Sequence, residues 1–407
     1  MRCGLLGKKL GHSYSPQIHS YLADYVYDLF EKQPEELKSF LENGDFTALN
    51  VTIPYKKEVI PYCNELSNRA QELGAVNTLV RRKDGTLIGH NTDYFGFESM
   101  LKRSGLCVKG KKVLVLGSGG ASATVVAVLK KHKANVIVIS RSGSDNYDNI
   151  QIHGDASVIV NTTPVGMYPN VGVSPVNLDL FPGLEGVLDV VYNPARTQLL
   201  LDAERKGLIT DNGLWMLVAQ AKESAEWFCG DKISDYKIPE IHGILQSQMQ
   251  NIVLIGMPGC GKSTIGKLLA EKLEKKFVDA DAAISQLAGK TIPEIFAASG
   301  EAGFRKLETQ VLQQLGKESG LVIATGGGCV TKAENYPALH QNGRIIWIRR
   351  DLSLLPTDGR PLSQQSRLED MYRIRMRLYE TFSDLSVDND GPIEETIAQI
   401  LAMEANI

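Results

Sequence analysis

The sequence has few cysteines, no long apolar run and little net charge. Its six cysteines are scattered through 407 residues without a C-x-x-C pair, which argues against a disulfide framework or a structural zinc site. No apolar run reaches the roughly 18 residues that a membrane-spanning helix needs, and the N-terminus has too short an apolar core for a signal peptide. A net charge of −3 gives no support for binding to nucleic acid or to an anionic membrane. We therefore expect a cytoplasmic chain without a nucleic-acid or membrane partner; its oligomeric state stays open.

A glycine-rich loop lies past the middle of the chain, between an apolar strand pattern (252–255) and a helical pattern. Gly256-x-x-x-x-Gly261-Lys262-Ser263 in this context predicts a phosphate-binding loop, with a glycine-rich surface turn as the alternative. Lys262 can reach the β and γ phosphates of ATP, and Ser263 can ligate Mg²⁺. At roughly 150 residues per domain, the part of the chain before this loop must hold at least one further domain. The expected nucleotide contacts are Gly259, Cys260, Gly261, Lys262, Ser263 and Thr264.

A second glycine loop follows the strand pattern at 111–116, whose residues 113–116 are apolar. Its spacing departs from G-x-G-x-x-G, because Ser122 occupies the third glycine position. The next strand pattern, 135–139, ends in Ser140-Arg141 rather than in the acidic residue that holds the ribose of NAD, which favours NADP(H). A surface salt bridge is the alternative role for Arg141. Because 143–157 lacks helical periodicity, we expect its crossover helix to be absent or reduced to a turn. The expected dinucleotide contacts are Gly117, Ser118, Gly119, Gly120, Ala121, Ser122, Ser140 and Arg141.

Polar side chains follow several strand patterns in the first hundred residues. Asn50 and Thr52 share one face of a strand, and Lys56 lies at the turn beyond it. Asp93 lies in a second polar loop that could face the first. Taken alone, each has an ordinary explanation: a lone lysine is usually solvated, and the serines before Pro16 fit a helix N-cap and a loop hydroxyl.

Together these motifs resemble those of shikimate dehydrogenase over 1–248. They are His12-Ser13-x-Ser15-Pro16, Asn50-Val-Thr52-x-Pro-x-Lys56, Ala75-Val-Asn77-Thr, Asn91-Thr-Asp93, the glycine loop and Gly213-Leu-x-Met216-Leu-Val-Ala-Gln220. The resemblance implies NADPH-dependent reduction of 3-dehydroshikimate to shikimate. It implies a substrate domain at 1–103, closed by a helix at 231–248, and a Rossmann NADP-binding domain at 104–230. His90 and Tyr94 depart from the family pattern.

The same resemblance assigns roles to individual residues. Ser13 and Ser15 would hold the substrate carboxylate, and Lys56 and Asp93 would flank the reacting oxygen. Tyr192 would lie near the substrate, and Met216 would pack on the nicotinamide. The ring hydroxyls of the substrate would be held by Asn50, Thr52, Asn77 and Gln220.

The remaining motifs follow the phosphate loop. Asp279 and Asp281 lie at i and i+2 after a strand pattern, where they would share one face. Arg305 and Glu308 are three apart at an expected helix start, and Arg375 and Tyr379 lie on a later helix. Solvated helix faces are the alternative for the arginines. Three glycines, Gly326, Gly327 and Gly328, end a strand pattern, and Arg360 follows a loop.

In this order the motifs resemble shikimate kinase over 249–407. The resemblance places Arg305, Arg375 and the three glycines around shikimate, with Asp281 on its hydroxyls as candidate proton acceptor. It places Asp279 with Ser263 near Mg²⁺, and Arg360 near the transferred phosphoryl group. Between Arg350 and Arg360 there is no Lys or Arg, so the usual second cation of the lid is missing.

The sequence thus predicts an α/β chain: an α/β substrate domain plus a Rossmann NADP domain, followed by a P-loop domain of the nucleoside-monophosphate-kinase type. The predicted function is reduction of 3-dehydroshikimate and ATP-dependent phosphorylation of shikimate to shikimate 3-phosphate, in aromatic amino-acid biosynthesis. One alternative is a quinate/shikimate-type dehydrogenase fused to another small-molecule kinase. Another is a nucleotide-sensing protein with decayed catalysis, against which Lys56, Asp93, Lys262, Ser263 and Asp281 argue.

Overall fold

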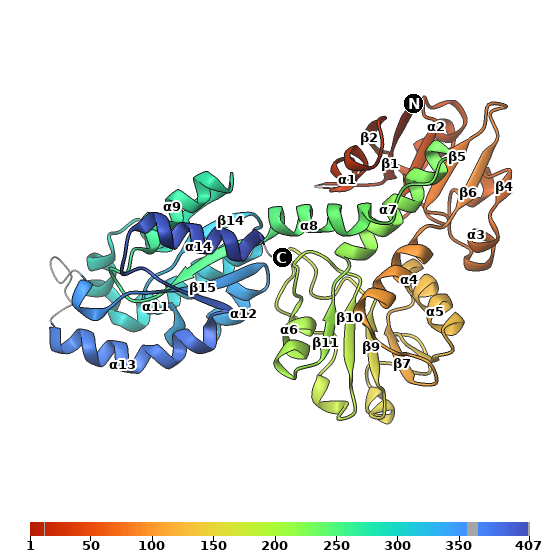
Figure 1. Ribbon diagram of the computed structural model, residues 1–407. Helices are drawn as coiled ribbons and strands as arrows, with labels where there is room; N and C mark the ends of the chain where they lie inside the picture. Colours follow the sequence, from red (N-terminus) through yellow and green to blue (C-terminus); the bar gives the residue numbers. More distant parts are fainter. Residues whose placement is uncertain (12, 356–364, 406–407) are drawn as a thin grey trace. The chain divides into compact units, whose positions relative to one another are not determined.

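The computed structural model describes residues 1–11, 13–355 and 365–405 and divides the chain into two compact units (Figure 1). Unit 1 comprises Met1–Val165, Ser174–Tyr192 and Asp202–Ile244. Unit 2 comprises Gly166–Val173, Asn193–Leu201 and Leu245–Ile407. Among the described helices, none combines the length and apolar character that crossing a membrane requires. Three separate sheets with flanking helices confirm the expected α/β class.

The first sheet of unit 1 has six strands in the order β2-β1-β3-β5-β6-β4. β1, β2 and β3 are parallel, whereas β5 is antiparallel to both β3 and β6. The β5–β6 hairpin turns at Asp84-Gly85, where Gly85 has φ +86°. The strands are Arg2–Gly7, Val26–Glu31, Ala48–Val51, Glu65–Leu66, Thr78–Arg81 and Leu87–His90 (β1 to β6). The helices are α1 (Ser15–Leu22), α2 (Leu37–Asn43) and α3 (Asn68–Leu73), with 3-10 turns at Pro34–Glu36 and Ile60–Tyr62.

The second sheet of unit 1 is fully parallel, in the order β11-β10-β9-β7-β8. Its strands are Lys112–Leu116, Asn135–Ile139, Val158–Asn161, Gly186–Asp189 and Ile209–Asp211 (β7 to β11). Between β8 and β9 lies only a 3-10 turn at Ile150–His153, which confirms the reduced crossover. The order places the switch point of the sheet between β7 and β9, where such folds bind ligands. The helices are α4 (Asp93–Ser104), α5 (Gly120–Lys131), α6 (Gln198–Arg205), α7 (Leu214–Cys229) and α8 (Lys237–Met249), with a 3-10 turn at Leu178–Leu180.

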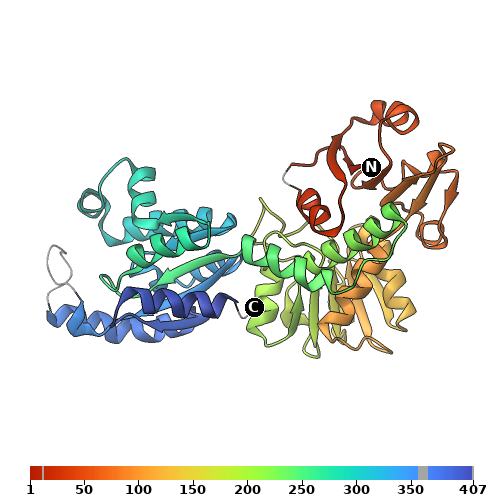
Figure 2. The same cartoon turned by 45° about the horizontal axis from the view of Figure 1, so that its top comes forward.

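Helix α7 links the two sheets of unit 1 (Figures 1 and 2). Near its start Met216 is buried in the core of the parallel sheet, and at its end Phe228 packs against Cys3 and Ala48 of the six-stranded sheet. Along its length it packs on α4, whose Gly96 approaches Met216 so closely that a Cβ would lie 2.7 Å from the Met216 carbonyl oxygen. Side chains on α7 therefore reach the strand ends of both sheets.

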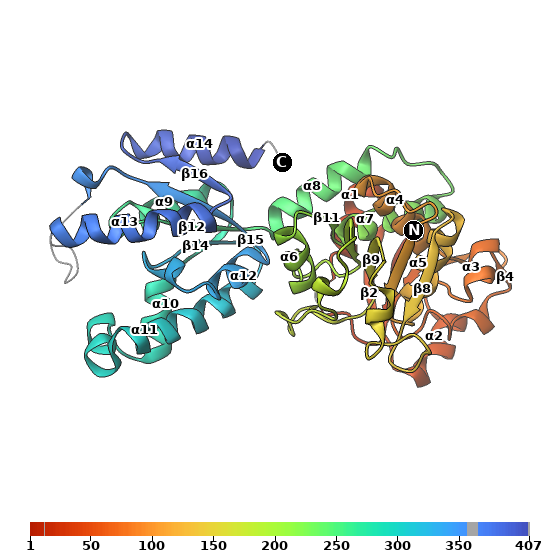
Figure 3. The same ribbon diagram turned by 90° about the horizontal axis from the view of Figure 1, so that it is seen from below.

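Unit 2 is built on a third, parallel sheet in the order β13-β14-β12-β15-β16. Helices α9 and α14 pack on one face, and α11 and α12 on the other (Figure 3). The strands are Asn251–Ile255, Lys276–Asp279, Leu321–Ala324, Gly343–Arg349 and Leu385–Asp388 (β12 to β16). The helices are α9 (Lys262–Lys272), α10 (Ala280–Ala288), α11 (Ile292–Lys317), α12 (Asn335–His340), α13 (Gln365–Phe382) and α14 (Ile393–Ala405), with 3-10 turns at Cys329–Thr331 and Leu352–Leu354.

Two local predictions are corrected by the structure. Asp281 does not continue a strand, because β13 ends at Asp279 and Asp281 belongs to the first turn of α10. The helix that carries Arg305 starts after Gly300, whose left-handed φ of 64° interrupts α11, and this is close to the start expected near Gly303. Ser15 is the first helical residue of α1, and Tyr14 is its N-cap. Each correction concerns an element boundary, and the side chains stay on the elements that carry them.

Candidate active sites

Lys56 and Asp93 form an ion pair in unit 1. Lys56 lies in the turn after β3, and Asp93 begins α4 directly after β6. The Lys56 Nζ lies 2.6 Å from Asp93 Oδ2, with side chains 23% and 12% exposed. The two polar loops therefore face each other as the sequence predicted. The pair offers a proton donor beside a carboxylate, which is the arrangement that general acid–base chemistry at an oxygen requires.

A buried network of polar side chains joins the six-stranded sheet to α7. Asn77 donates through Nδ2 to Thr92 Oγ1 at 3.0 Å and to Gln220 Oε1 at 3.4 Å, and accepts from the Thr92 N–H at 2.7 Å. Asn50 donates to Ser224 Oγ at 2.7 Å. The structure thus brings together Asn50, Asn77 and Gln220, which lie up to 170 residues apart in the sequence.

The other side of Asn50 contacts an aromatic cluster. Its Oδ1 accepts from the Tyr27 hydroxyl at 2.8 Å, and the Tyr27 ring stacks on His19 at 4.1 Å between centroids. Burial lowers the pKa of His19 to about 3, so this ring is neutral at physiological pH. His19 also contacts the Tyr25 hydroxyl through Nδ1 at 2.5 Å. No signal in the sequence indicated this cluster.

The remaining predicted substrate residues lie at the start of α1, after β3 and after β10. Ser13 Oγ accepts from the Ser15 N–H at 3.2 Å, which makes the loop into α1 a local turn. Tyr192 contacts Tyr14 edge to face at 6.3 Å. Thr52 directly follows β3, and its backbone N–H donates to the Leu6 carbonyl at 2.9 Å.

The dinucleotide loop lies between β7 and α5. Gly117 has φ +104°, and a Cβ there would lie 2.9 Å from Thr162 Oγ1, so the position admits only glycine. Gly119 is the N-cap of α5, and open space surrounds the Cβ positions of Gly119 and Gly120. Because β8 pairs with β7 in register, Arg141, which is exposed, follows the strand beside this loop. The arrangement leaves a helix N-terminus and a guanidinium for phosphate groups.

The phosphate loop of unit 2 has the conformation that the motif predicted. Gly256, Gly259 and Gly261 have φ values of +144°, +87° and +100°. Lys262 donates to the carbonyl oxygens of Gly256 and Met257, both at 2.9 Å, and so spans the loop from inside. These contacts hold the ammonium where a triphosphate would lie.

Ser263 and Asp279 meet beside the phosphate loop. Ser263 Oγ donates to Asp279 Oδ2 at 2.7 Å, while Asp279 Oδ1 caps α10 by accepting from the Asp281 N–H at 3.0 Å. A hydroxyl and a carboxylate oxygen are the hard donors that Mg²⁺ takes in kinases, with water and phosphate oxygens completing the shell. The donor set therefore fits a magnesium ion held between the loop and β13.

Four predicted shikimate-binding elements converge at the glycine run after β14. A Cβ on Gly328 would lie 2.0 Å from Arg305 Nη2, and one on Gly326 would lie 2.9 Å from Asp281 Oδ1. Arg375 Nη1 donates to the Gly327 carbonyl oxygen at 3.1 Å. A side chain on Gly326 would displace Asp281, and one on Gly328 would displace Arg305, which is a physical reason for glycine at these two positions. Arg360 lies outside the described residues, so its position stays a prediction.

Glu308 is a site residue to which sequence reasoning assigned no role. It is fully buried and accepts from Arg305 Nη1 at 2.7 Å, and a Cβ on Gly326 would lie 2.8 Å from its Oε1. Burial raises the pKa of Glu308, although Arg305 opposes this. Burial alone would lower the pKa of Arg305, but Glu308 and Glu301 raise it overall. The guanidinium is thus held charged, and the spacing of three residues was the only signal for its partner.

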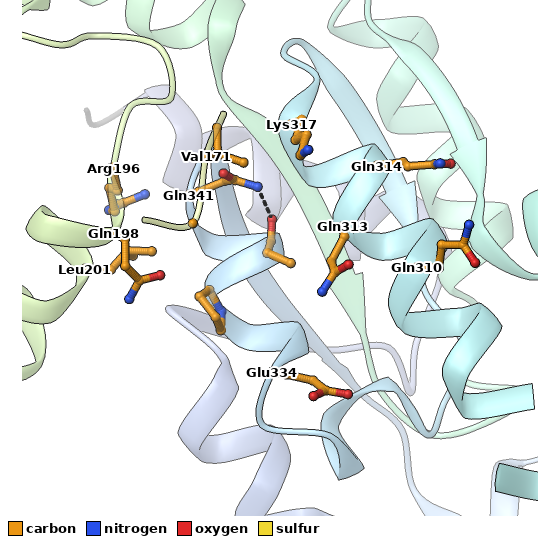
Figure 4. A pocket seen from close by; sticks show the side chains of 13 residues that line it. Val171, Arg196, Gln198, Leu201, Gln310, Gln313, Gln314, Lys317, Glu334 and Gln341 are labelled. Carbon is orange, nitrogen blue, oxygen red and sulfur yellow. Dashed lines mark hydrogen bonds between the residues drawn. The ribbon is translucent and has the colours of Figure 1, made fainter. Parts of the chain in front are cut away.

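A polar hollow of about 530 Å³ also lies in unit 2 (Figure 4). Gln310, Gln313 and Gln314 line it from α11, and Gln198 lines it from the start of α6. Arg196, which also lines the hollow, donates through Nη1 to the His340 carbonyl oxygen at 3.0 Å. None of the described residues that line the hollow was predicted from the sequence to belong to either active site.

Comparisons with known proteins match one enzyme family to the first part of the chain and another to the last part. A family model of the shikimate dehydrogenase substrate binding domain matches residues 5–79, and the shikimate kinase model matches residues 258–404. A shikimate dehydrogenase (NADP(+)) of Clostridium perfringens is 35% identical over 252 residues, covering 56% of this chain and 93% of the relative.

Solved structures extend the likeness to the fold. Shikimate dehydrogenase 1 from Peptoclostridium difficile is 35% identical, with a TM-score of 0.56 over 60% of this chain and 97% of that one. A chorismate mutase/shikimate 5-dehydrogenase fusion protein from Clostridium acetobutylicum is 36% identical, with a TM-score of 0.57 and the same coverage. Quinate dehydrogenase from Corynebacterium glutamicum in complex with NAD is 27% identical, with a TM-score of 0.54 over 59% of this chain and 97% of that one.

The dehydrogenase relatives are covered almost end to end, and the residues after them match a second enzyme family. The chain therefore belongs to the shikimate dehydrogenase family and is a bifunctional enzyme of the shikimate pathway, in which an NADP-dependent shikimate dehydrogenase is followed by an ATP-using shikimate kinase.

Proposed function

We propose that Lys56 and Asp93 carry proton transfer in the reduction of 3-dehydroshikimate. NADPH supplies the hydride, which adds to the ring carbonyl carbon and leaves negative charge on the oxygen. The Lys56 ammonium donates a proton to that oxygen, and the Asp93 carboxylate holds the ammonium in position. The observation that carries this proposal is the 2.6 Å pair between two partly buried side chains.

We infer that the amide network binds the substrate ring. Asn50 of β3, Asn77 just before β5 and Gln220 of α7 present hydrogen-bonding groups, as the ring hydroxyls of shikimate require. Thr52 completes this set, and Ser13 and Ser15 hold the carboxylate. Tyr192 contacts the substrate, and Met216 packs on the nicotinamide. Ser118, Ala121 and Ser122 bind NADP(H) with the glycines of the loop, and Ser140 and Arg141 contact its 2′-phosphate.

For the kinase we propose that shikimate is held by Arg305, Arg375 and Gly326–Gly328. Asp281 accepts the proton of the attacking hydroxyl, and Glu308 keeps Arg305 in place. The phosphate loop with Lys262 binds ATP, Ser263 and Asp279 hold Mg²⁺, and Arg360 stabilises the transferred phosphoryl group. Nothing in these steps requires covalent chemistry by the protein, because positioning and charge neutralisation carry most of phosphoryl transfer.

The proposal extends to domain limits and location. The functional domains are 1–103 with 231–248, then 104–230, then 249–407. The chain acts in the cytoplasm on small molecules, without nucleic acid. The likeness to a quinate dehydrogenase makes quinate the competing substrate.

Separate assays of the two activities test this proposal. Oxidation of shikimate with NADP⁺ is measured against oxidation of quinate with NADP⁺ or NAD⁺, and phosphorylation is measured with shikimate and with quinate. We expect kcat/KM for shikimate to exceed that for quinate in both reactions. A chain that prefers quinate, or that phosphorylates another small molecule better, contradicts the assignment.

A further inference from the structure

Ser224 connects the polar groups of the dehydrogenase site. It lies on α7 one turn after Gln220 and is fully buried. Its hydroxyl accepts from Asn50 Nδ2 at 2.7 Å and donates to the Gln220 carbonyl oxygen at 2.9 Å. It also lies 2.8 Å from Thr92 Oγ1 and 3.0 Å from Thr78 Oγ1.

A count of protons assigns a direction to these contacts. A serine hydroxyl has one proton to donate and accepts two at most. Since the proton goes to Gln220 and Asn50 supplies one accepted bond, one threonine hydroxyl supplies the other. Thr92 is closer, and its 2.8 Å contact with Ser224 is shorter than those to the other acceptors in reach of its hydroxyl, Asn77 Oδ1 at 3.2 Å and Gln220 Oε1 at 3.4 Å. Thr92 in turn accepts from Asn77 Nδ2 at 3.0 Å. Thr78 is then free to donate to Asn77 Oδ1 at 3.1 Å.

The resulting chain fixes the orientation of two amides. Asn77 donates to Thr92, Thr92 donates to Ser224, and Ser224 donates to the backbone of α7. Asn50 is held at both ends, because its Nδ2 donates to Ser224 and its Oδ1 accepts from Tyr27. A flip of Asn77 would set its Nδ2 against the Thr92 N–H, two donors in a buried site, and a flip of Asn50 would require the Tyr27 and Ser224 hydroxyls to turn and give up their present bonds; both are costly.

We propose that Ser224 is a positioning residue for shikimate, which orients the amides of Asn50 and Asn77 toward the ring hydroxyls. This inference rests on the proposed binding role of those two residues. Ser224 is fully buried and acts only through its neighbours. It also links the orientation of groups on the six-stranded sheet to α7, which carries Gln220.

The test compares Ser224→Ala with Ser99→Ala in the full-length chain. Ser99 lies on α4, and its hydroxyl accepts from Trp215 Nε1 of α7 at 2.8 Å. Ser99→Ala removes one hydrogen bond between α7 and a neighbouring element and does not touch the network, whereas Ser224→Ala removes the bonds that its hydroxyl accepts from Asn50 and Thr92 and the one that it donates within α7. KM and kcat are measured for NADP⁺-dependent oxidation of shikimate without ATP, together with KM for NADP⁺.

Ser224→Ala should raise the KM for shikimate about 10-fold, because loss of a buried partner costs on the order of 1–2 kcal/mol. Its kcat and its KM for NADP⁺ should change less than about threefold, and so should every constant of Ser99→Ala. The ratio of kcat/KM for shikimate to that for analogues lacking one ring hydroxyl should fall only in Ser224→Ala. The KM for shikimate in phosphorylation should not change.

Ser224→Cys distinguishes an effect of the lost hydrogen bonds from an effect of lost folding. The thiol fills the space but bonds weakly, so we expect a melting temperature near that of the wild type and an intermediate KM. A wild-type KM in Ser224→Cys, or equal changes in Ser224→Ala and Ser99→Ala, would overturn the inference. If the unmodified chain fails to oxidise shikimate, the proposed function fails instead, which is a different result.

Discussion

Replacing Lys56 by Met should abolish most reduction while sparing cofactor binding. The change removes the ammonium 2.6 Å from Asp93 and keeps much of the side-chain volume. A positive charge about 3 Å from a developing oxyanion contributes roughly 5 kcal/mol at an effective dielectric constant near 20. Water that enters the vacated space offsets part of this. We therefore expect kcat to fall by about 10² to 10⁴, the usual range for loss of a general acid.

The assay follows NADPH absorbance with saturating 3-dehydroshikimate and varied NADPH. The KM for NADPH should stay within about twofold, because Lys56 lies in the turn after β3 and not on the dinucleotide loop. Lys57→Met is the matched control, since Lys57 is the next residue and is exposed. Phosphorylation of shikimate by the same preparation measures the amount of folded chain. A kcat for Lys56→Met equal to that of Lys57→Met would refute the role of the ion pair.

Three further predictions concern single residues. Arg141→Ala should raise the KM for NADPH about 10-fold and that for NADH less than about twofold; equal losses would make Arg141 structural. Asp279→Asn should raise the Mg²⁺ concentration for half-maximal phosphorylation at least about 10-fold and leave shikimate oxidation unchanged; an unaltered Mg²⁺ requirement would remove Asp279 from the metal site. Burial raises the pKa of Glu223, which pairs with Arg69, to about 7 from 4.5. Because the folded carboxyl keeps its proton more tightly than the unfolded one, the free energy of unfolding should fall between pH 4.5 and about 7, by at most roughly 3 kcal/mol. Calorimetry of Glu223→Gln should lack this decline; parallel curves for the two proteins would contradict it.

The sequence predicted the parts of the site that depend on local pattern. Glycine loops between a strand and a helix have fixed geometry, so Gly117 and Gly256 took the expected conformations. Lys56 and Asp93 each lie in a polar loop after a strand pattern, and the sequence suggested that the two loops could face each other. These features follow from short stretches of chain whose conformation is restricted.

The residues that sequence reasoning missed act over long separations. Ser224 lies 174 residues from Asn50, and its role depends on the path of α7 between two sheets. His19 gained its environment from Tyr27 and Phe228, which no periodicity connects to it. The spacing of Arg305 and Glu308 is also typical of an ion pair on a solvated helix face, and only the packing of the glycine run on Glu308 distinguishes the two cases. Tertiary packing decided these three positions, and no local pattern encodes it.

The most direct test of the account is the coupled reaction of the full-length chain. Purified protein receives 3-dehydroshikimate, NADPH and MgATP, and NADPH, ATP, shikimate and shikimate 3-phosphate are followed together. The account predicts equal consumption of NADPH and ATP for each shikimate 3-phosphate formed. Without ATP the reaction should stop at shikimate, and without NADPH no phosphorylated product should appear. NADPH oxidation without formation of shikimate, or accumulation of shikimate that the same chain does not phosphorylate in the presence of MgATP, would contradict it.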